Sequence, residues 1–159
     1  MSETKITVPR SKSLAKGLIA GLIGGLVGTL AKTLAERMFP PRTHGEPEPL
    51  QVAAERVAGH ALDADSKAVA GEAIQWGFGA AVGAAYGALA EYYPAATSKE
   101  GASFGMALEA LTRETALPAL GLSSEPEDAT LRERASEMTS HVVYGVATET
   151  VRGFVRKWL

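Results

Sequence analysis

Residues 17–31 read GLIAGLIGGLVGTLA, a run of fifteen residues without a charged side chain. Lys32 interrupts the run, but a lysine near a helix end can extend its ammonium group to the membrane interface. Counted to Ala35, the segment has nineteen residues, close to the ~20 that a membrane-spanning helix needs. The Pro40-Pro41 pair then stops it, because proline cannot continue a helix. We therefore expect a spanning helix over residues 17–38.

A cleaved signal peptide is the competing interpretation of the same region, because basic residues precede the apolar run. The run is followed by Lys32, Glu36 and Arg37 and has no clean small-x-small cleavage site. We expect the segment to be retained, with residues 1–16 as a basic cytoplasmic arm.

Composition allows one domain with a real core and excludes several kinds of site. The 159 residues carry a formal charge of −2, which gives no reason to expect nucleic-acid binding. Cysteine is absent, so disulfides, thiolate metal sites and cysteine nucleophiles are excluded. The mean hydropathy is only slightly positive. Either the apolar residues are concentrated in a few segments, or the chain is an ordinary soluble bundle.

A second uncharged stretch covers residues 73–90, AIQWGFGAAVGAAYGALA. Trp76 lies near one end, and Tyr92 and Tyr93 follow the other, as in the aromatic belts of spanning helices. We expect a helix over residues 68–93.

The remaining segments carry more charge. Apolar residues from Leu50 onward recur at i, i+3 and i+4 and predict an amphipathic surface helix over 50–64. Residues 101–121 are apolar apart from three charged residues, and Pro118 should kink their far end. Residues 131–157 have an apolar centre followed by basic residues. Within a bundle, such charges can face inward in pairs while the apolar sides contact lipid.

These segments predict an all-α fold: an integral membrane bundle of about four transmembrane helices plus one amphipathic surface helix, in a single domain over residues 17–159. Four basic residues precede the first helix and three end the last one. Residues 36–72 carry seven acidic residues against four basic ones, and residues 125–137 carry five against two. With four crossings, this pattern places both termini in the cytoplasm.

Small residues repeat along the predicted helices. In water, glycine inside a helix costs about 1 kcal/mol relative to alanine. In lipid, small-xxx-small faces let helices approach closely. The glycines expected at helix contacts are Gly21, Gly25, Gly28, Gly79, Gly83, Gly87 and Gly145. Beside the lipid bilayer, a second copy or another membrane protein could be a partner through the same faces.

His141 is the strongest polar candidate, because its charge can change between about pH 5 and 8. It shares a helix face with Glu137 and Glu149 at i+4 steps, a stripe that would suit a proton relay or pH sensor. The simpler interpretation, which we favour, is that His141 hydrogen-bonds a neighbouring helix and the glutamates lie at the interface.

The third segment supplies the other candidates. Glu109 and Arg113 are four residues apart in the favourable order and can pair on one face. Glu114 needs its own partner, and His141 is the one we suggest. The candidate intramembrane polar site is therefore His141, Glu149, Glu109, Arg113 and Glu114.

No catalytic, cofactor or metal pattern is present. His60 with Asp63 and Asp65 faintly suggests a metal, but the close spacing of a multi-ligand site is missing. The glycines follow helical spacing and do not form a phosphate loop. No serine or threonine has a base placed to activate it. We expect a protein that is not an enzyme, with no cofactor and no metal.

Several short motifs give the chain a resemblance. They are Phe39-Pro40-Pro41-Arg42, Gly83-x-x-Tyr86-Gly87 with Glu91 and Pro94, Gly101-x-x-Phe104-Gly105 with Glu114, Pro118 and Gly121, and His141-x-x-Tyr144-Gly145 with Glu149. From about Lys16 onward the chain resembles the YagU-like bacterial inner-membrane proteins. The resemblance implies a four-helix integral membrane protein and no established reaction. Where that family has His-Glu, this chain has Arg113-Glu114.

We therefore expect a non-enzymatic inner-membrane bundle with an accessory, structural or stress-related (pH) role. Two alternatives remain. One is a small transporter or channel whose polar path uses His141, Glu114 and Arg113. The other is a peripheral scaffold with a single N-terminal membrane anchor.

Overall fold

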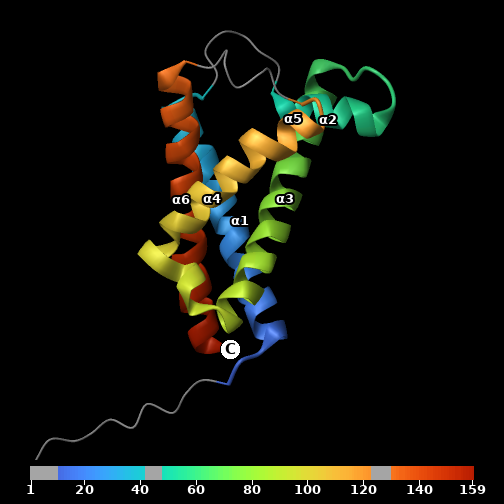
Figure 1. Cartoon of the computed structure of the whole chain (residues 1–159). Helices are drawn as coiled ribbons and strands as arrows, with labels where there is room; N and C mark the ends of the chain where they lie inside the picture. Colours follow the sequence, from blue (N-terminus) through green and yellow to red (C-terminus); the bar gives the residue numbers. More distant parts are fainter. Residues whose placement is uncertain (1–10, 42–47, 123–129) are drawn as a thin grey trace, which may run out of the picture.

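The structure, a computed structural model, describes residues 11–41, 48–122 and 130–159 (Figure 1). No β-strand occurs among these residues, which confirms the all-α fold class. The elements are α1 (Leu14–Met38), α2 (Pro49–Ala58), α3 (Ala64–Tyr92), the 3-10 segment η1 (Pro94–Gly101), α4 (Ala102–Leu111), the π-helical segment η2 (Thr112–Ala116), α5 (Leu117–Ala119) and α6 (Leu131–Trp158).

Capping side chains determine where the long helices begin. Ser13 accepts a hydrogen bond from a backbone N–H in the first turn of α1. Thr130 and Glu133 form a reciprocal capping box at the start of α6. Asp63 caps α3 by accepting a 3.0 Å bond from the backbone N–H of Ser66, and this bond lowers the pKa of Asp63.

Helices α1 and α3 lie side by side in opposite directions. Gly17, in the first turn of α1, lies against Gly87 near the end of α3. Thr29, three turns further along α1, lies against Gly79. The order of contacts is therefore reversed between the two helices.

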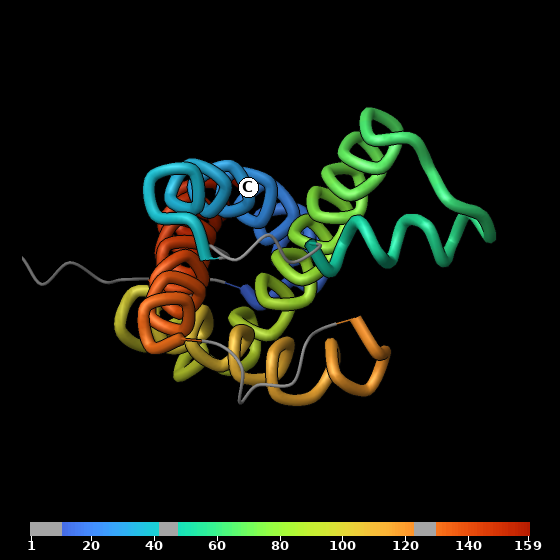
Figure 2. Tube along the Cα trace, turned by 90° about the horizontal axis from the view of Figure 1, so that it is seen from above, coloured from blue at the N-terminus to red at the C-terminus, as the bar shows by residue number. Residues whose placement is uncertain are grey.

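Helix α6 also runs antiparallel to α1, and α4 runs antiparallel to α6. Gly24 of α1 lies against Thr148 of α6, whereas Ser136, near the start of α6, donates a hydrogen bond to the backbone oxygen of Phe39 after the end of α1. Gly101, at the start of α4, lies against Gly145. Directions thus alternate through α1, α3, α4 and α6, and α4 with α5 lies across from α1 in the view down the bundle (Figure 2).

The glycine contacts bring helix backbones against one another. A Cβ atom added at Gly83 would lie 2.5 Å from the carbonyl oxygen of Gly21 and from Cα of Gly25. A Cβ at Gly145 would lie 2.9 Å from Cα of Gly105 on α4. The seven glycines singled out in the sequence, Gly21, Gly25, Gly28, Gly79, Gly83, Gly87 and Gly145, all lie at contacts of this kind.

Large apolar side chains of α1 are exposed, and several polar side chains of the bundle are buried. On α1, Ile19 is 50 % exposed and Leu22 is 43 % exposed, whereas the buried residues of this helix are glycine, alanine and threonine. The buried positions elsewhere include Glu109, Thr148 and Arg156, at 4 %, 0 % and 6 % exposure. Large apolar side chains of α1 therefore point outward, and charged and hydroxyl groups are buried beside Tyr86 and Tyr144.

Among the described residues, α1 is the one helix that is long and apolar enough to cross a membrane, with a hydropathy of 1.7 over an 18-residue window. Helix α3 has 29 residues, but its uncharged stretch over 73–90 contains Gln75 and four glycines, which lower its hydropathy. Helix α6 carries charged residues along much of its length. Hydropathy thus supports membrane association through one helix rather than the four that the sequence suggested.

Three predicted helix ranges need correction. The amphipathic helix predicted over 50–64 stops at Gly59, whose left-handed backbone (φ 74°) ends α2. Helix α3 begins directly after its cap, Asp63, rather than at residue 68. The helix predicted over 101–121 runs from Ala102 to Ala119 but contains the π-helical turn η2, ahead of Pro118, which has no N–H to donate. Outside the described residues lie the first ten residues of the basic arm, Arg42 and the part of the acidic loop at 123–129.

Candidate functional site

The start of α1 lies beside the ends of α3 and α6 (Figure 1), and paired charged side chains gather there. Glu91 of α3 accepts two hydrogen bonds from the Arg156 guanidinium of α6, one of them 3.0 Å long. Glu149 accepts two 2.6 Å bonds from Arg152 and a 2.8 Å bond from the Tyr86 hydroxyl. We call Tyr86, Glu91, Glu149, Arg152 and Arg156 the terminal ion cluster. It joins α3 to α6 through paired charges that are shielded from solvent.

Helical spacing explains why α6 can supply three members of this cluster. Residues three, four and seven positions apart share one helix face, and Glu149, Arg152 and Arg156 have steps of three and four. The start of α1 joins the same cluster. The backbone N–H of Ser13 donates to Glu91 at 3.1 Å, and Arg156 donates to the backbone oxygen of Ser11 at 3.0 Å.

A second polar group lies toward the other end of the bundle, between α1 and α6. Lys32 pairs with Glu36 within α1, and the Ser140 hydroxyl of α6 donates to Glu36 at 3.3 Å. His141 lies beside them, with Nδ1 2.9 Å from the carbonyl oxygen of Glu137. Because a carbonyl can only accept, Nδ1 carries the hydrogen in this arrangement.

On the other side of α6, η2 contributes Arg113. This guanidinium pairs with Glu137 of α6 and lies 3.8 Å from Glu109 of α4. The predicted Glu109–Arg113 pair is therefore present, but the closer carboxylate comes from another helix. Glu114 is exposed and does not reach His141, so the partner suggested for it was wrong. The physical reason is the π-helical turn, which changes the direction of residues 112–116 relative to α-helical spacing.

An aromatic core separates the two polar regions. The Tyr86 ring stacks on Phe104 of α4 with centroids 4.0 Å apart, and Phe104 lies 6.0 Å from Tyr144 of α6. The Tyr144 hydroxyl donates to the backbone oxygen of Gly79 at 2.7 Å. Thr148 is fully buried, with no hydrogen-bond partner for its hydroxyl among the described residues. The three aromatic motifs noted in the sequence thus meet in one core that spans α3, α4 and α6.

The structure divides the five predicted site residues among separate places. Glu149 belongs to the terminal ion cluster, Glu109 and Arg113 lie together on α4 and η2, His141 lies near α1, and Glu114 is exposed. The predicted stripe of Glu137, His141 and Glu149 lies on one helix, but each member has a different neighbour.

The predicted site lacked four members of the terminal ion cluster: Tyr86, Glu91, Arg152 and Arg156. A usable signal was the repeated Tyr-Gly pattern followed by glutamate, which occurs before both Glu91 and Glu149. Glu149 was already a candidate, and Glu91 occupies the equivalent position in the repeat. Helical spacing alone could not indicate that their cations lie on the same helix.

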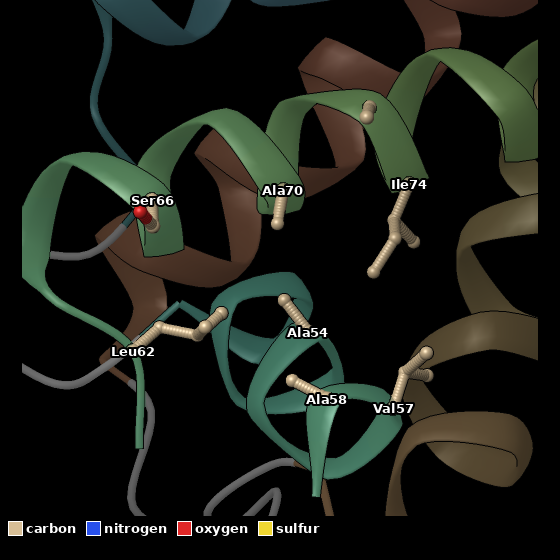
Figure 3. Close-up of a pocket in the computed structure, with 8 residues that line it drawn as sticks. Ala54, Val57, Ala58, Leu62, Ser66, Ala70 and Ile74 are labelled. Atoms are coloured by element: carbon tan, nitrogen blue, oxygen red, sulfur yellow. The ribbon is translucent and has the colours of Figure 1, made fainter. Parts of the chain in front are cut away.

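A shallow apolar groove lies between α2 and α3 (Figure 3). It encloses about 390 Å³ and is lined by Ala54, Val57, Ala58, Leu62, Ser66, Ala70, Ala73 and Ile74. The Ser66 hydroxyl is the polar side chain among them, and it donates to Asp63 at 2.7 Å. The groove therefore offers apolar contact and no group that would act on a substrate.

In the clusters described above, charged side chains are paired with side chains of opposite charge. Within the described residues, no three His, Asp or Glu side chains lie close enough to hold a metal ion. His60, the one histidine considered for a metal, is exposed, and its Nδ1 lies 2.9 Å from the backbone oxygen of Ala61. The polar interior thus joins helices to one another.

Comparison with known proteins gives one match. A family model described as "Protein of unknown function (DUF1440)" matches residues 26–150. The matched range runs from the middle of α1 into α6 and includes the aromatic core. No curated protein and no solved structure matches the chain.

Proposed function

We propose that this chain, which belongs to the DUF1440 family of proteins of unknown function, is a non-enzymatic, multi-pass bundle of a bacterial inner membrane. In this proposal α1, α3, α6 and the arm formed by α4 and α5 cross the bilayer. Both termini lie in the cytoplasm, and α2 lies at the opposite surface. The resemblance to YagU-like inner-membrane proteins favours the same location.

One observation carries the proposal: the small-residue face of α1 is covered by both α3 and α6. Contacts with α3 extend from Gly17 to Thr29, and contacts with α6 include Gly24 and Gly28. Helix α1 is the segment that would enter a membrane on its own hydropathy. If α1 enters the bilayer with these contacts intact, α3 and α6 must enter it as well. A single N-terminal anchor is therefore disfavoured.

The exposed side chains support the same location. Leu18, Ile23, Val27 and Leu30 project from α1 at 37–48 % exposure. In water, such a surface would favour aggregation, whereas lipid solvates it at no cost. Several ionic side chains that lipid would exclude, such as Arg113, Glu137 and Glu149, are instead turned inward and paired, as charges in membrane bundles are.

The internal pairing favours an accessory or structural role over transport. Arg113 is bonded to Glu137, His141 to a backbone oxygen, and Glu149 to Arg152. A permeation path needs polar groups that can exchange these partners for a passing ion. Flux through proteoliposomes that is abolished by His141→Ala would replace our proposal with a transporter or channel.

Accessibility of single cysteines tests the topology, because the natural chain has no cysteine to remove. We expect Ser98→Cys and Lys157→Cys to react with an impermeant maleimide only after the cytoplasmic face is opened. His60→Cys and Arg132→Cys should react from outside in intact cells. All four positions are exposed, so burial would not hide them.

The alternatives give different labelling patterns. A single N-terminal anchor places all four cysteines on one side of the membrane. A soluble bundle leaves the whole chain in the supernatant after cell lysis and ultracentrifugation. Either result would overturn the proposal, whereas alternation between sides requires α3 and α6 to cross.

A further inference from the structure

We infer that the end of the bundle that carries Lys12, Lys16 and Lys157 binds the phosphate groups of anionic phospholipids. We call these three residues the lysine end. The inference rests on the proposed membrane location and adds the class of lipid that the protein selects.

Residues from both ends of the described chain meet at this place (Figure 1). Lys12 Nζ lies 5.9 Å above the centre of the Tyr92 ring at the end of α3. Lys16 donates to the backbone oxygen of Leu159. Lys157 follows Arg156, which is bonded to Ser11 next to Lys12. The terminal ion cluster thus holds the three lysines at one end of the bundle.

The glutamates at this end are paired with arginines, and the oxygen of Leu159 that accepts from Lys16 carries at most one negative charge against three lysines. Glu91 and Glu149 are paired with the guanidiniums of Arg156 and Arg152. On η1, the neighbouring Lys99 and Glu100 offset each other in formal charge, and both are exposed. The side chains of the lysine end are also exposed. They leave a cationic surface that is complementary to phosphate.

Aromatic side chains set the depth of this surface in the bilayer. Trp158 is 79 % exposed and Tyr93 is 66 % exposed, and the Trp158 ring lies 6.0 Å from that of Phe154. Tryptophan and tyrosine prefer the level of the lipid headgroups. Because Lys157 is adjacent to Trp158, and Lys12 lies over Tyr92, the ammonium groups reach the layer of lipid phosphates. Each cation near an anionic lipid surface raises the affinity for that surface about fivefold.

The two tryptophans of the chain provide the test. Trp158 lies at the lysine end, and Trp76 lies on α3 toward the opposite end. The full chain is reconstituted in equimolar phosphatidylglycerol and phosphatidylcholine, with bromine on the acyl chains of one lipid or the other. Trp76→Phe leaves Trp158 as the reporter, and Trp158→Phe leaves Trp76. We expect brominated phosphatidylglycerol to quench Trp158 several-fold more than brominated phosphatidylcholine, and Trp76 to be quenched equally by both.

Charge-removing variants identify the residues responsible. Replacing Lys12, Lys16 and Lys157 together by glutamine should abolish the preference at Trp158. The matched control, Arg37→Gln with Arg132→Gln, removes exposed cations from the opposite end and should leave it unchanged. At equal ionic strength, added inorganic phosphate should reduce the preference for phosphatidylglycerol at Trp158 no more than chloride does, because the ligand is a lipid rather than a free ion.

The possible failures can be told apart. Equal quenching of Trp158 by both lipids, or a preference that survives in the triple variant, would overturn the lipid inference alone. If inorganic phosphate abolished the preference and chloride at the same ionic strength did not, the lysine end would bind a soluble anion, and the lipid inference would again be overturned. No quenching of either tryptophan by any brominated lipid would contradict the membrane location itself.

Discussion

Alanine in place of Gly83 is expected to destabilise the bundle by about 2–3 kcal/mol, as overpacking of a close contact does. The added Cβ would lie 2.5 Å from the carbonyl oxygen of Gly21 and from Cα of Gly25. Both are backbone atoms and cannot rotate away, so α1 and α3 must separate along the contact. The free energy of unfolding can be measured by titration with a denaturing detergent, followed by helical circular dichroism.

Gly77→Ala is the matched control for this change. Gly77 lies on the same helix, six residues earlier, and a Cβ there would meet nothing within 4 Å. Alanine should therefore leave stability unchanged or raise it by up to about 1 kcal/mol through its helix propensity. If both substitutions had the same effect, the close contact between α1 and α3 would not be a source of stability.

The contrast between these two glycines shows how far sequence spacing can predict contacts. Gly79, Gly83 and Gly87 are four residues apart, so they share one face, and a helix contact there is predictable. Gly77 lies on a different face and is not part of the repeat. Spacing does not say which helix fills the face, because Gly21 and Gly25 of α1 and Gly145 of α6 offer similar small surfaces.

Ionic partners were predictable only within one helix. Glu109 and Arg113 were expected to pair because they are four apart, and they lie 3.8 Å from each other. The closer partner, Glu137, is on α6, and local spacing contains no information about it. The pairing of Glu91 with Arg156, 65 residues later, depends likewise on the order in which helices meet.

Helix boundaries failed where the local backbone departs from α-helical geometry. Asp63 and Gly59 are ordinary cap residues, yet the apolar spacing around them continues and conceals the break between α2 and α3. Pro118 correctly indicated a distortion, but the distortion lies upstream in η2 and redirects Glu114. Helical periodicity assumes a constant turn, so it cannot predict the side on which residues lie after such a segment.

Removal of Arg156 is expected to have the largest effect of any single charge change, because its partner is buried. The side chains of Arg156 and Glu91 are 7 % and 6 % exposed. Arg156→Met leaves the Glu91 carboxylate without its cation and the backbone oxygen of Ser11 without a donor. Breaking a buried pair in this way costs about 3–5 kcal/mol. The same detergent titration measures it.

A double variant at positions 91 and 156 distinguishes the cost of leaving Glu91 without its cation from the cost of losing the other contacts of Arg156. Glu91→Leu with Arg156→Met removes both charges, and most of the stability should return, to within about 1 kcal/mol. The remaining deficit belongs to the backbone N–H of Ser13, which donates to Glu91 at 3.1 Å. The more exposed pair of Glu55 and Lys67, whose side chains are 27 % and 29 % exposed, is the control, and Lys67→Met should change stability little. A double variant as unstable as Arg156→Met would mean that the cost lies in lost arginine contacts. The paired charges would then not be what joins α3 to α6.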